Sequence, residues 1–274
     1  MRQTKLGIST YSYPYAVGYP GFMPEQRATP MTLIDKAKQL GVDVLQIADN
    51  LPLEQYTPEE LEQISQYARE RGIELEVGTR GIGTEHLTRY VEIAQALNSK
   101  LLRVVIDTKD DQPDVDEIVR RLGRILPLLE ERKIVLGIEN HDRFKAEVFA
   151  DLVRRFDSPW LGIVLDTVNS YACEENTQQV LDSLAQYTVN FHVKDYVIER
   201  IPNSMGLQVV GVPAGKGFLP VGQVLDRLKR EAQQDFSTIL ELWMPQEKGV
   251  EETLRKEEQW VDESIAYLNS VLHC

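Results

Sequence analysis

The feature of this sequence that most constrains its fold is a regular alternation of short apolar runs with helical patterns. Eight runs are rich in β-branched residues and have the length of buried strands; they span residues 5–10, 44–49, 74–79, 101–107, 134–139, 161–166, 188–193 and 238–243. Eight helical patterns alternate with them, over residues 30–41, 57–72, 84–98, 114–133, 145–156, 176–187, 220–234 and 250–273. Strands that are mostly apolar on both faces are typical of a parallel sheet covered by helices, and eight strands close a barrel. The pattern therefore predicts an α/β fold, a (β/α)₈ TIM barrel.

A single domain over residues 1–274 is expected, because no linker, low-complexity tract or repeat divides the chain. An open, doubly wound sheet is the alternative, but no glycine-rich GxGxxG turn follows the first strand. Two long connections, 11–29 and 196–219, follow strands and are candidate lids at the catalytic mouth. Within the second, the backbone amides of "AGKGF" (214–218) and Lys216 could hold an anion, or this segment is a simple turn.

Charge and composition exclude several classes of partner. The chain has 43 acidic and 30 basic residues, a net charge of -13, so its overall field would repel the phosphate backbone of a nucleic acid. No run approaches the roughly 20 apolar residues that span a bilayer, and the first ten residues lack the core of a signal peptide. Cys173 and Cys274 are too few for a disulfide framework, which favours free thiols. We expect a cytoplasmic protein that binds neither nucleic acid nor membrane.

Metal-ligating residue types stand at the ends of four late strands. They are Glu139, Asp166, His192 and Glu241, separated by 27, 26 and 49 residues. We interpret these gaps as one, one and two βα units, so that each side chain comes from a different strand. Because chemistry in parallel barrels is located at the carboxyl ends of the strands, the four side chains are expected to converge.

A divalent cation is the chemistry that this convergence predicts. Three carboxylates that meet without a cation would repel one another and be poorly solvated. An oxygen-rich set with one imidazole favours Mn²⁺ or Mg²⁺, with Co²⁺ and Zn²⁺ as alternatives. A single Glu, Asp or His at a strand end is commonly a hydrogen-bonded structural residue, whereas four at barrel spacing indicate a metal site.

Several further polar residues are candidates for substrate binding. His141 would contact substrate or support a ligand of the metal. Lys194 would contact substrate, or would pair with Asp195 or with a ligand carboxylate. Arg80 could clamp an anionic group by bidentate hydrogen bonds or form a structural ion pair. Trp243 is expected at the floor of the pocket.

The sequence around the four strand ends resembles a known family. The phrases "IENHDRF", "LDTVN", "FHVKD" and "ILELW" are similar to those of the xylose-isomerase-like barrel superfamily, over essentially the whole chain. That superfamily comprises sugar phosphate isomerases and epimerases, and also includes apurinic endonucleases. The resemblance implies a metal that chelates the carbonyl and adjacent hydroxyl of a sugar and stabilises an enediolate, while Glu139 and Glu241 move a proton on and off carbon.

Two departures from the family's pattern bear on the reaction. Ketose 3-epimerases carry a further Glu six residues after the first ligand and an Arg six residues after the ligand His; here Lys145 and Ile198 stand at those positions. A strict ketose 3-epimerase is therefore disfavoured. The endonuclease branch is excluded, because its three-metal cluster needs several histidines and this chain has four in all.

Three functions remain open at this point. The first is an isomerase or epimerase of a small sugar or sugar derivative. The alternative is a lyase on the same scaffold that decarboxylates a 3-oxo sugar acid such as 3-oxo-isoapionate, because Lys145, Lys194 or Arg80 would suit a substrate with a carboxylate. The third is a sugar-binding barrel without catalysis, which an intact set of ligands argues against. Related barrels often form dimers or tetramers, so a homo-oligomer is also expected.

Overall fold

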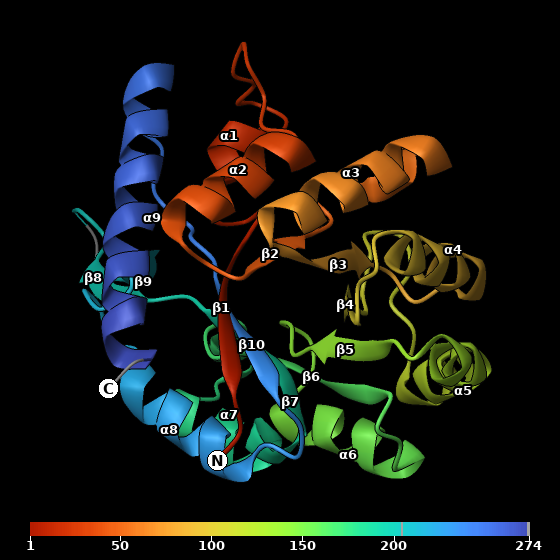
Figure 1. Cartoon of the computed structure of the whole chain (residues 1–274). Coiled ribbons are helices and arrows are strands. Elements are labelled where there is room, and N and C mark those ends of the chain that lie inside the picture. The colour runs from red at the N-terminus through yellow and green to blue at the C-terminus, as the bar shows by residue number, and fades with distance from the viewer. Residues whose placement is uncertain (204, 273–274) are drawn as a thin grey trace.

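Eight parallel strands close into a barrel at the centre of the molecule, as the computed structural model shows for residues 1–203 and 205–272. The order around the barrel is β1-β10-β7-β6-β5-β4-β3-β2 (Figure 1). The strands are β1 (Thr4–Ser9), β2 (Val44–Ile47), β3 (Glu74–Arg80), β4 (Leu101–Val105), β5 (Val135–Glu139), β6 (Leu161–Asp166), β7 (Thr188–Val193) and β10 (Phe236–Leu240). The predicted (β/α)₈ barrel is confirmed.

Helices form an outer layer around these strands (Figure 1). They are α1 (Pro14–Val17), α2 (Pro30–Leu40), α3 (Pro58–Arg71), α4 (Thr84–Ala96), α5 (Val115–Arg132), α6 (Ala146–Phe156), α7 (Thr177–Leu184), α8 (Val221–Glu231) and α9 (Val250–Leu272). Local signals set their ends: α3 begins with a capping box between Thr57 and Glu60 and ends at Gly72, whose φ of 70° suits a residue without a side chain.

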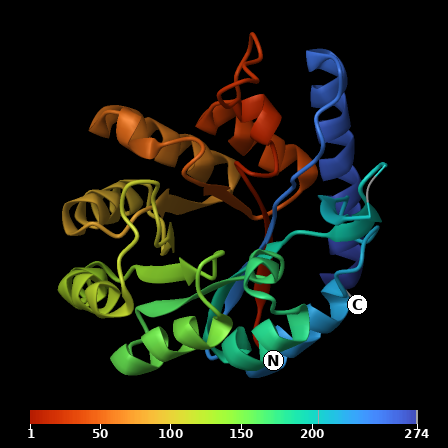
Figure 2. The ribbon, with the colours of Figure 1, turned by 180° about the vertical axis from the view of Figure 1, so that it is seen from behind.

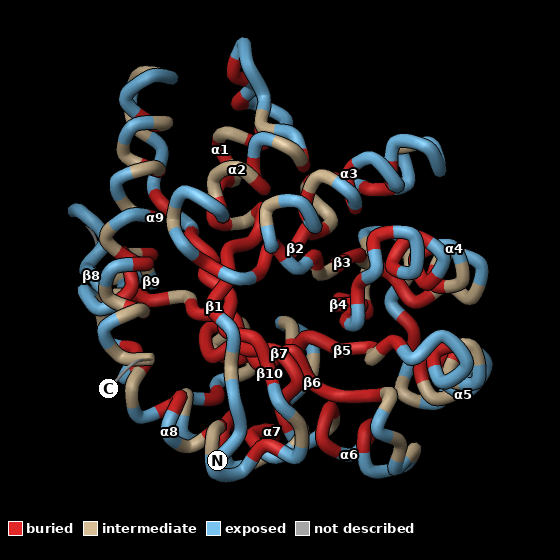
Figure 3. Tube along the Cα trace, viewed as in Figure 1, coloured by how far each residue is buried: buried red, intermediate tan, exposed pale blue. Residues whose placement is uncertain are grey.

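The strands are buried, as the colouring of Figure 3 shows, because side chains fill the inside of such a barrel and helices cover its outside. Every residue of β6 and of β7 is buried. The core inside the barrel is not wholly apolar, since Gln46, Arg103 and Asn190 are each at most 2% exposed. These three polar side chains come from β2, β4 and β7.

The connection 196–219 holds a β-hairpin, which the sequence analysis did not predict. Strands β8 (Tyr196–Arg200) and β9 (Leu207–Gly211) pair antiparallel, and Figures 1 and 2 show them beside α9, outside the barrel. The 49 residues between His192 and Glu241 therefore contain one βα unit with a hairpin inserted, and the prediction of two units was wrong. Strands β7 and β10 are direct neighbours, which brings the two residues closer than two units would allow.

The first part of the connection 11–29 is packed against α9. Tyr13 and Tyr15 are buried, and the Glu257 carboxylate on α9 accepts hydrogen bonds from the amides of Tyr15 (2.6 Å) and Ala16 (3.0 Å). Burial raises the pKa of Glu257 to about 8. The carboxyl group thus binds amides of the first turn of α1, which have no partner within the helix, from a helix more than 200 residues away in sequence.

Among the described residues, no helix combines the length and the apolar character needed to cross a bilayer. Cys173 carries a free thiol, whereas Cys274 lies outside the described residues.

Candidate metal centre

The four predicted ligands lie on four strands that are consecutive around the barrel. Glu139 and Asp166 are the last residues of β5 and β6, His192 lies within β7, and Glu241 follows β10 directly. Asp166 and His192 are register partners on neighbouring strands. All four residues are between 0% and 2% exposed. Parallel strands that end at one edge of the barrel therefore bring these side chains into one buried cluster.

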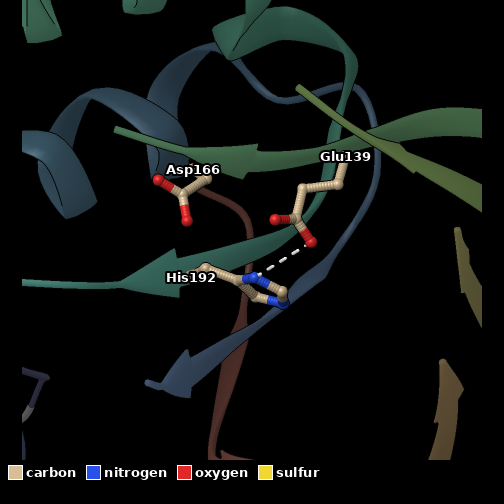
Figure 4. Close-up of side chains that lie close together, drawn as sticks. All are labelled: Glu139, Asp166 and His192. Atoms are coloured by element: carbon tan, nitrogen blue, oxygen red, sulfur yellow. Dashed lines mark ion pairs between the residues drawn. The ribbon is translucent and has the colours of Figure 1, made fainter. Parts of the chain in front are cut away.

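Three of these residues could bind a common ion. Ligand atoms of Glu139, Asp166 and His192 all lie within 4.8 Å of one another, and Figure 4 shows the three side chains pointing toward one another from adjacent strands. His192 Nδ1 is 3.4 Å from Glu139 Oε2 and 3.5 Å from Glu241 Oε1. Glu241 stands outside the three-residue group but beside its imidazole.

The buried Nδ1 of His192 is the observation that tests whether a metal fits. This atom makes no hydrogen bond in the described part of the chain, although it is shielded from solvent. A buried nitrogen without a hydrogen bond is costly, and a bond to a cation would satisfy it. One imidazole nitrogen and several carboxylate oxygens are donors that suit Mn²⁺ or Mg²⁺. The residues fit a divalent ion.

Lys194 is the counter-ion of the cluster. Its Nζ lies 2.7 Å from Asp166 Oδ2, 2.9 Å from Glu241 Oε2 and 4.0 Å from Glu139 Oε1. Burial alone would lower the pKa of Lys194, but the three carboxylates raise it well above its ordinary value. Of the predicted roles, pairing with ligand carboxylates is the one that the structure contains.

Arg103 is a central residue whose role the sequence analysis did not recognise. Its Nε lies 2.6 Å from Glu139 Oε2 and its Nη1 lies 2.7 Å from Asp49 Oδ1, with a side chain only 3% exposed. Burial would raise the pKa of Glu139, but the Arg103 guanidinium, helped by the Lys194 ammonium, holds it well below its usual range. The available signal was a single charged residue inside the apolar run "LLRVVID".

Two asparagines orient the carboxylates of β5 and β6. Asp166 Oδ1 accepts hydrogen bonds from the amides of Val168 (2.7 Å) and Asn169 (2.9 Å). The Asn169 side chain donates to Glu139 Oε1 at 2.9 Å, and the Asn140 side chain bonds the backbone of Asp166 in both directions. The asparagines of "IEN" and "DTVN" thus set the directions in which Glu139 and Asp166 point.

Arg80, a predicted substrate clamp, is engaged with the protein itself. Its Nε lies 3.2 Å from Asp49 Oδ2 and its Nη1 donates to the Asp107 carbonyl at 3.2 Å. The side chain is 35% exposed. Because Asp49 also binds Arg103, Arg80 is connected to the metal cluster through one shared carboxylate.

His141 and Lys145 lie outside the cluster. Strand β5 ends at Glu139, so His141 does not continue its inward face; His141 Nδ1 lies 3.0 Å from Asp142 Oδ2, and the imidazole side chain is 25% exposed. Lys145 is exposed at the amino end of α6. No hydrogen bond or ion pair between described residues joins Lys145 to the cluster. The structure therefore does not bring either side chain onto the four ligands.

Trp243 packs against the hairpin. The residue is 39% exposed, and its indole nitrogen is 3.4 Å from the carbonyl of Asp195. The indole covers Gly211, where a Cβ atom would come within 1.6 Å of the ring. The ring thus needs glycine at the end of β9 and packs between the barrel and the hairpin.

Backbone amides of the "AGKGF" segment do bind a carboxylate, and it is the side chain of Asp195 in the same protein. The Asp195 carboxylate accepts hydrogen bonds from the amides of Gly215 (2.8 Å), Gly217 (2.9 Å) and Leu219 (3.0 Å). These amides are therefore occupied by an internal side chain. Asp195 fixes the return of the connection to the barrel, immediately next to Lys194.

The ion pairs of the site form one continuous network. It joins four carboxylates to three cations, which leaves a formal charge of -1 with His192 neutral; the members are Asp49, Glu139, Asp166, Glu241, Arg80, Arg103 and Lys194. A bound divalent ion would change this charge to +1. The loaded site would then attract a ligand with one negative charge.

Comparison with known proteins identifies the family. The model of the family described as "Xylose isomerase-like TIM barrel" matches residues 34–271, and the chain belongs to this family, which confirms the resemblance. The chain is 34% identical over 263 residues to the 3-oxo-isoapionate decarboxylase of Pectobacterium atrosepticum, covering 96% of this chain and 94% of that protein.

Solved structures agree on the fold. A D-psicose 3-epimerase crystallised in the presence of D-fructose superimposes with a TM-score of 0.72 at 17% identity, covering 98% of this chain and 99% of that one. A xylose isomerase-like TIM barrel protein from Mycobacterium smegmatis in complex with magnesium gives a TM-score of 0.69 at 13% identity, covering 98% of both chains. At sequence identities this low, the similarity shows only that these proteins share the barrel fold. Two sequence relatives of this chain, the 3-oxo-isoapionate decarboxylase and a D-psicose 3-epimerase of Enterocloster bolteae at 25% identity, are enzymes.

Proposed function

We propose that this protein is a divalent-metal-dependent decarboxylase of a 3-oxo sugar acid. The observation that carries the proposal is the ion-pair network, whose charge of -1 would become +1 with a divalent ion and so match a substrate with one carboxylate. The 34% identity over nearly the full length to a 3-oxo-isoapionate decarboxylase supports the same choice. The presence of Lys145 and Ile198 at the two epimerase positions also favours it.

Glu139, Asp166, His192 and Glu241 would hold the metal, with Mn²⁺ or Mg²⁺ preferred and Co²⁺ or Zn²⁺ as alternatives. When bound, the ion supplies a Lewis acid that polarises the ketone of the substrate. Arg103 keeps Glu139 ionised for this role, because its guanidinium lies 2.6 Å from the carboxylate. Asn169 fixes the direction of the other oxygen of Glu139.

Lys194 and Glu241 would handle the proton. In the reaction the bond between the carboxyl carbon and the sugar breaks, CO₂ leaves, and one proton takes its place on the sugar carbon. Glu241 Oε2 holds the Lys194 ammonium at 2.9 Å from Nζ, and the ammonium would give its proton directly to the carbon that loses CO₂ and then be reprotonated from solvent. The ammonium would also attract the substrate carboxylate before the bond breaks.

Isomerisation or epimerisation of a sugar is the second candidate function. It is favoured by one observation: Glu139 Oε2 and Glu241 Oε1 flank His192 Nδ1 at 3.4 and 3.5 Å, as two carboxyl groups that exchange a proton with opposite sides of a substrate would. In that reaction Glu139 and Glu241 are the acid and the base. His141, Arg80, Trp243 and Lys145 remain predicted substrate contacts for both functions, and homo-oligomerisation remains a prediction.

The two functions differ in the atoms that leave the substrate. Protein stripped with EDTA and reloaded with Mn²⁺ would be incubated with a 3-oxo sugar acid while CO₂ is measured, and in parallel with simple ketoses in D₂O while deuterium at carbon is measured. We expect metal-dependent CO₂ release and no wash-in of deuterium. Wash-in without CO₂ release would establish the second function instead. Glu241→Gln, which keeps the shape of the side chain, should abolish either activity.

A further inference from the structure

A layer of polar side chains lies in the barrel interior next to the metal cluster, on the side away from the strand ends. Gln46 on β2 and Glu76 on β3 are register partners, and so are Asn190 on β7 and Ser237 on β10. Gln46 Nε2 donates to Glu76 Oε2 at 3.0 Å, and Asn190 Nδ2 donates to the same oxygen at 2.9 Å. The layer thus bridges opposite walls of the barrel.

This layer reaches the metal cluster through one hydrogen bond. Gln46 Oε1 lies 2.9 Å from Nε2 of His192, and both side chains are 0% exposed. Gln46 therefore has two contacts with different requirements: its oxygen faces the imidazole and its nitrogen faces Glu76. The amide oxygen can only accept a hydrogen bond, so Nε2 of His192 must carry the proton in this contact.

Glu76 determines which end of the Gln46 amide faces His192. An ionised carboxylate only accepts hydrogen bonds, so Glu76 holds the amide nitrogen and directs the amide oxygen toward His192. The Ser237 hydroxyl contacts the other carboxylate oxygen, Oε1. A proton on Glu76 would reside on Oε1, facing a hydroxyl that can accept it, so Oε2 stays an acceptor for Gln46 in either protonation state.

We propose that Gln46 and Glu76 are positioning residues that fix His192 in the tautomer with its proton on Nε2, so that the lone pair of Nδ1 is presented to the metal. Nδ1 lies toward Glu139 and Glu241 and makes no hydrogen bond among the described residues. Histidine ligands of metals are commonly held by a hydrogen bond to the other ring nitrogen, and here the acceptor is an amide aligned by a second residue. The inference rests on the proposed role of His192 as a ligand.

The tautomer can be measured without any metal. The protein labelled with ¹⁵N-histidine would be stripped with EDTA, and the ring nitrogens of His192 would be assigned by comparison with His192→Gln. In the neutral ring we expect the proton to reside on Nε2. In Gln46→Met, which keeps the length of the side chain but removes the acceptor, we expect a mixture of both tautomers, and in Glu76→Gln a smaller shift in the same direction.

Binding of Mn²⁺, measured by calorimetry, is the second readout. Gln46→Met should weaken it by about 10–100-fold, and Glu76→Gln by less than Gln46→Met, because loss of a partner of a metal ligand has effects of this size. Thr238→Val is the matched control: it removes a buried hydroxyl that bonds Thr4 on the neighbouring strand and leaves the layer intact. It should change neither the tautomer nor the affinity.

The outcomes separate this inference from the proposed function. A wild-type protein with the proton on Nδ1, or Gln46→Met and Glu76→Gln variants that keep both the tautomer and the Mn²⁺ affinity of wild type, would overturn the positioning role. Wild-type protein with the expected tautomer but without affinity for Mn²⁺ would instead overturn the metal site. If Gln46→Met does not fold, Glu76→Gln, which has nearly the shape of the original side chain, carries the test.

Discussion

Glu139 and Glu76 are two carboxyl groups of the same barrel interior that behave in opposite ways. Glu139 stands at the end of β5 beside Arg103 and Lys194, and these cations hold its pKa well below the ordinary range against the effect of burial. Glu76 stands on β3, and burial raises its pKa to about 7.

The neighbours of the two groups account for the difference. Glu76 receives hydrogen bonds from Gln46, Asn190 and Ser237, all of them neutral donors. Such hydrogen bonds lower a pKa, but burial outweighs them here, whereas a full positive charge at 2.6 Å from Glu139 outweighs burial. The charge of the neighbours therefore decides which of the two carboxyl groups has a lowered pKa and which a raised one.

The largest expected effect comes from removing the cation beside Glu139. Arg103→Met leaves Glu139 without its guanidinium in a buried site, while Asp49 keeps Arg80, and this should cost about 3–5 kcal/mol of the free energy of unfolding. Urea denaturation of EDTA-stripped protein measures this. Arg154→Met, at an exposed pair of α6, is the control and should leave stability unchanged within error. Equal effects of the two substitutions would contradict the importance given to Arg103.

Lys194→Met removes the second cation and tests the proposed chemistry. We expect Mn²⁺ to bind at least as tightly as in wild type, because an ammonium that competes for Asp166 and Glu241 is gone. Turnover of a 3-oxo sugar acid should fall about a hundredfold or more, because the proton source is lost. Calorimetry and CO₂ release measure the two quantities, with the loop substitution Lys216→Met as control. Turnover within threefold of wild type would exclude Lys194 from the reaction.

Glu76 should make stability depend on pH in the direction opposite to an ordinary carboxylate. Its pKa of about 7 in the folded protein lies above the ordinary 4.5, so the folded state binds more protons between these values. The contribution is present below pH 4.5 and lost as pH rises through 7, by about 1–3 kcal/mol. Glu76→Gln should remove this loss in urea titrations, and Glu74→Gln, on the same strand but exposed, should retain it. A slope unchanged in Glu76→Gln would rule out the assignment.

The smallest effect is expected at Ser237. Ser237→Ala removes one of the donors that lower the pKa of Glu76, so the pKa should rise further and stability above pH 7 should fall by about 0.5–1.5 kcal/mol. Denaturation at pH 8 measures the loss. The same substitution made in Glu76→Gln is the control and should lose less, because the charged acceptor is absent. An equal loss in both backgrounds would show that Ser237 does not act through Glu76.

The fold and the convergence of the four strand ends could be predicted from local patterns. Glu139 and Asp166 are the last residues of their strands as the apolar runs indicated, and parallel connections place such ends at one edge. The hairpin β8–β9 was missed because its two short runs were included in one long connection. This error made the interval between His192 and Glu241 look like two βα units when it is one.

The roles of Arg80, Lys194 and Asp195 could not be predicted, because each residue type has several suitable partners. Arg80 could have bound a substrate but pairs with Asp49. Lys194 could have paired with Asp195 but pairs with Asp166 and Glu241, while Asp195 binds backbone amides of the segment 214–218. The choice among partners depends on distances that only the assembled barrel defines.

The sequence by itself determined the barrel and the four strand ends that carry Glu139, Asp166, His192 and Glu241, because the periodicity of strands and helices and the position of a residue at a strand end are local properties. Only the tertiary structure decided which charges surround each of these side chains and which hydrogen bond holds His192. Gln46 and His192 are 146 residues apart in the chain, and Glu76 and Asn190 are 114 apart. Their contacts exist because closure of the barrel brings opposite walls together, and no local pattern specifies them.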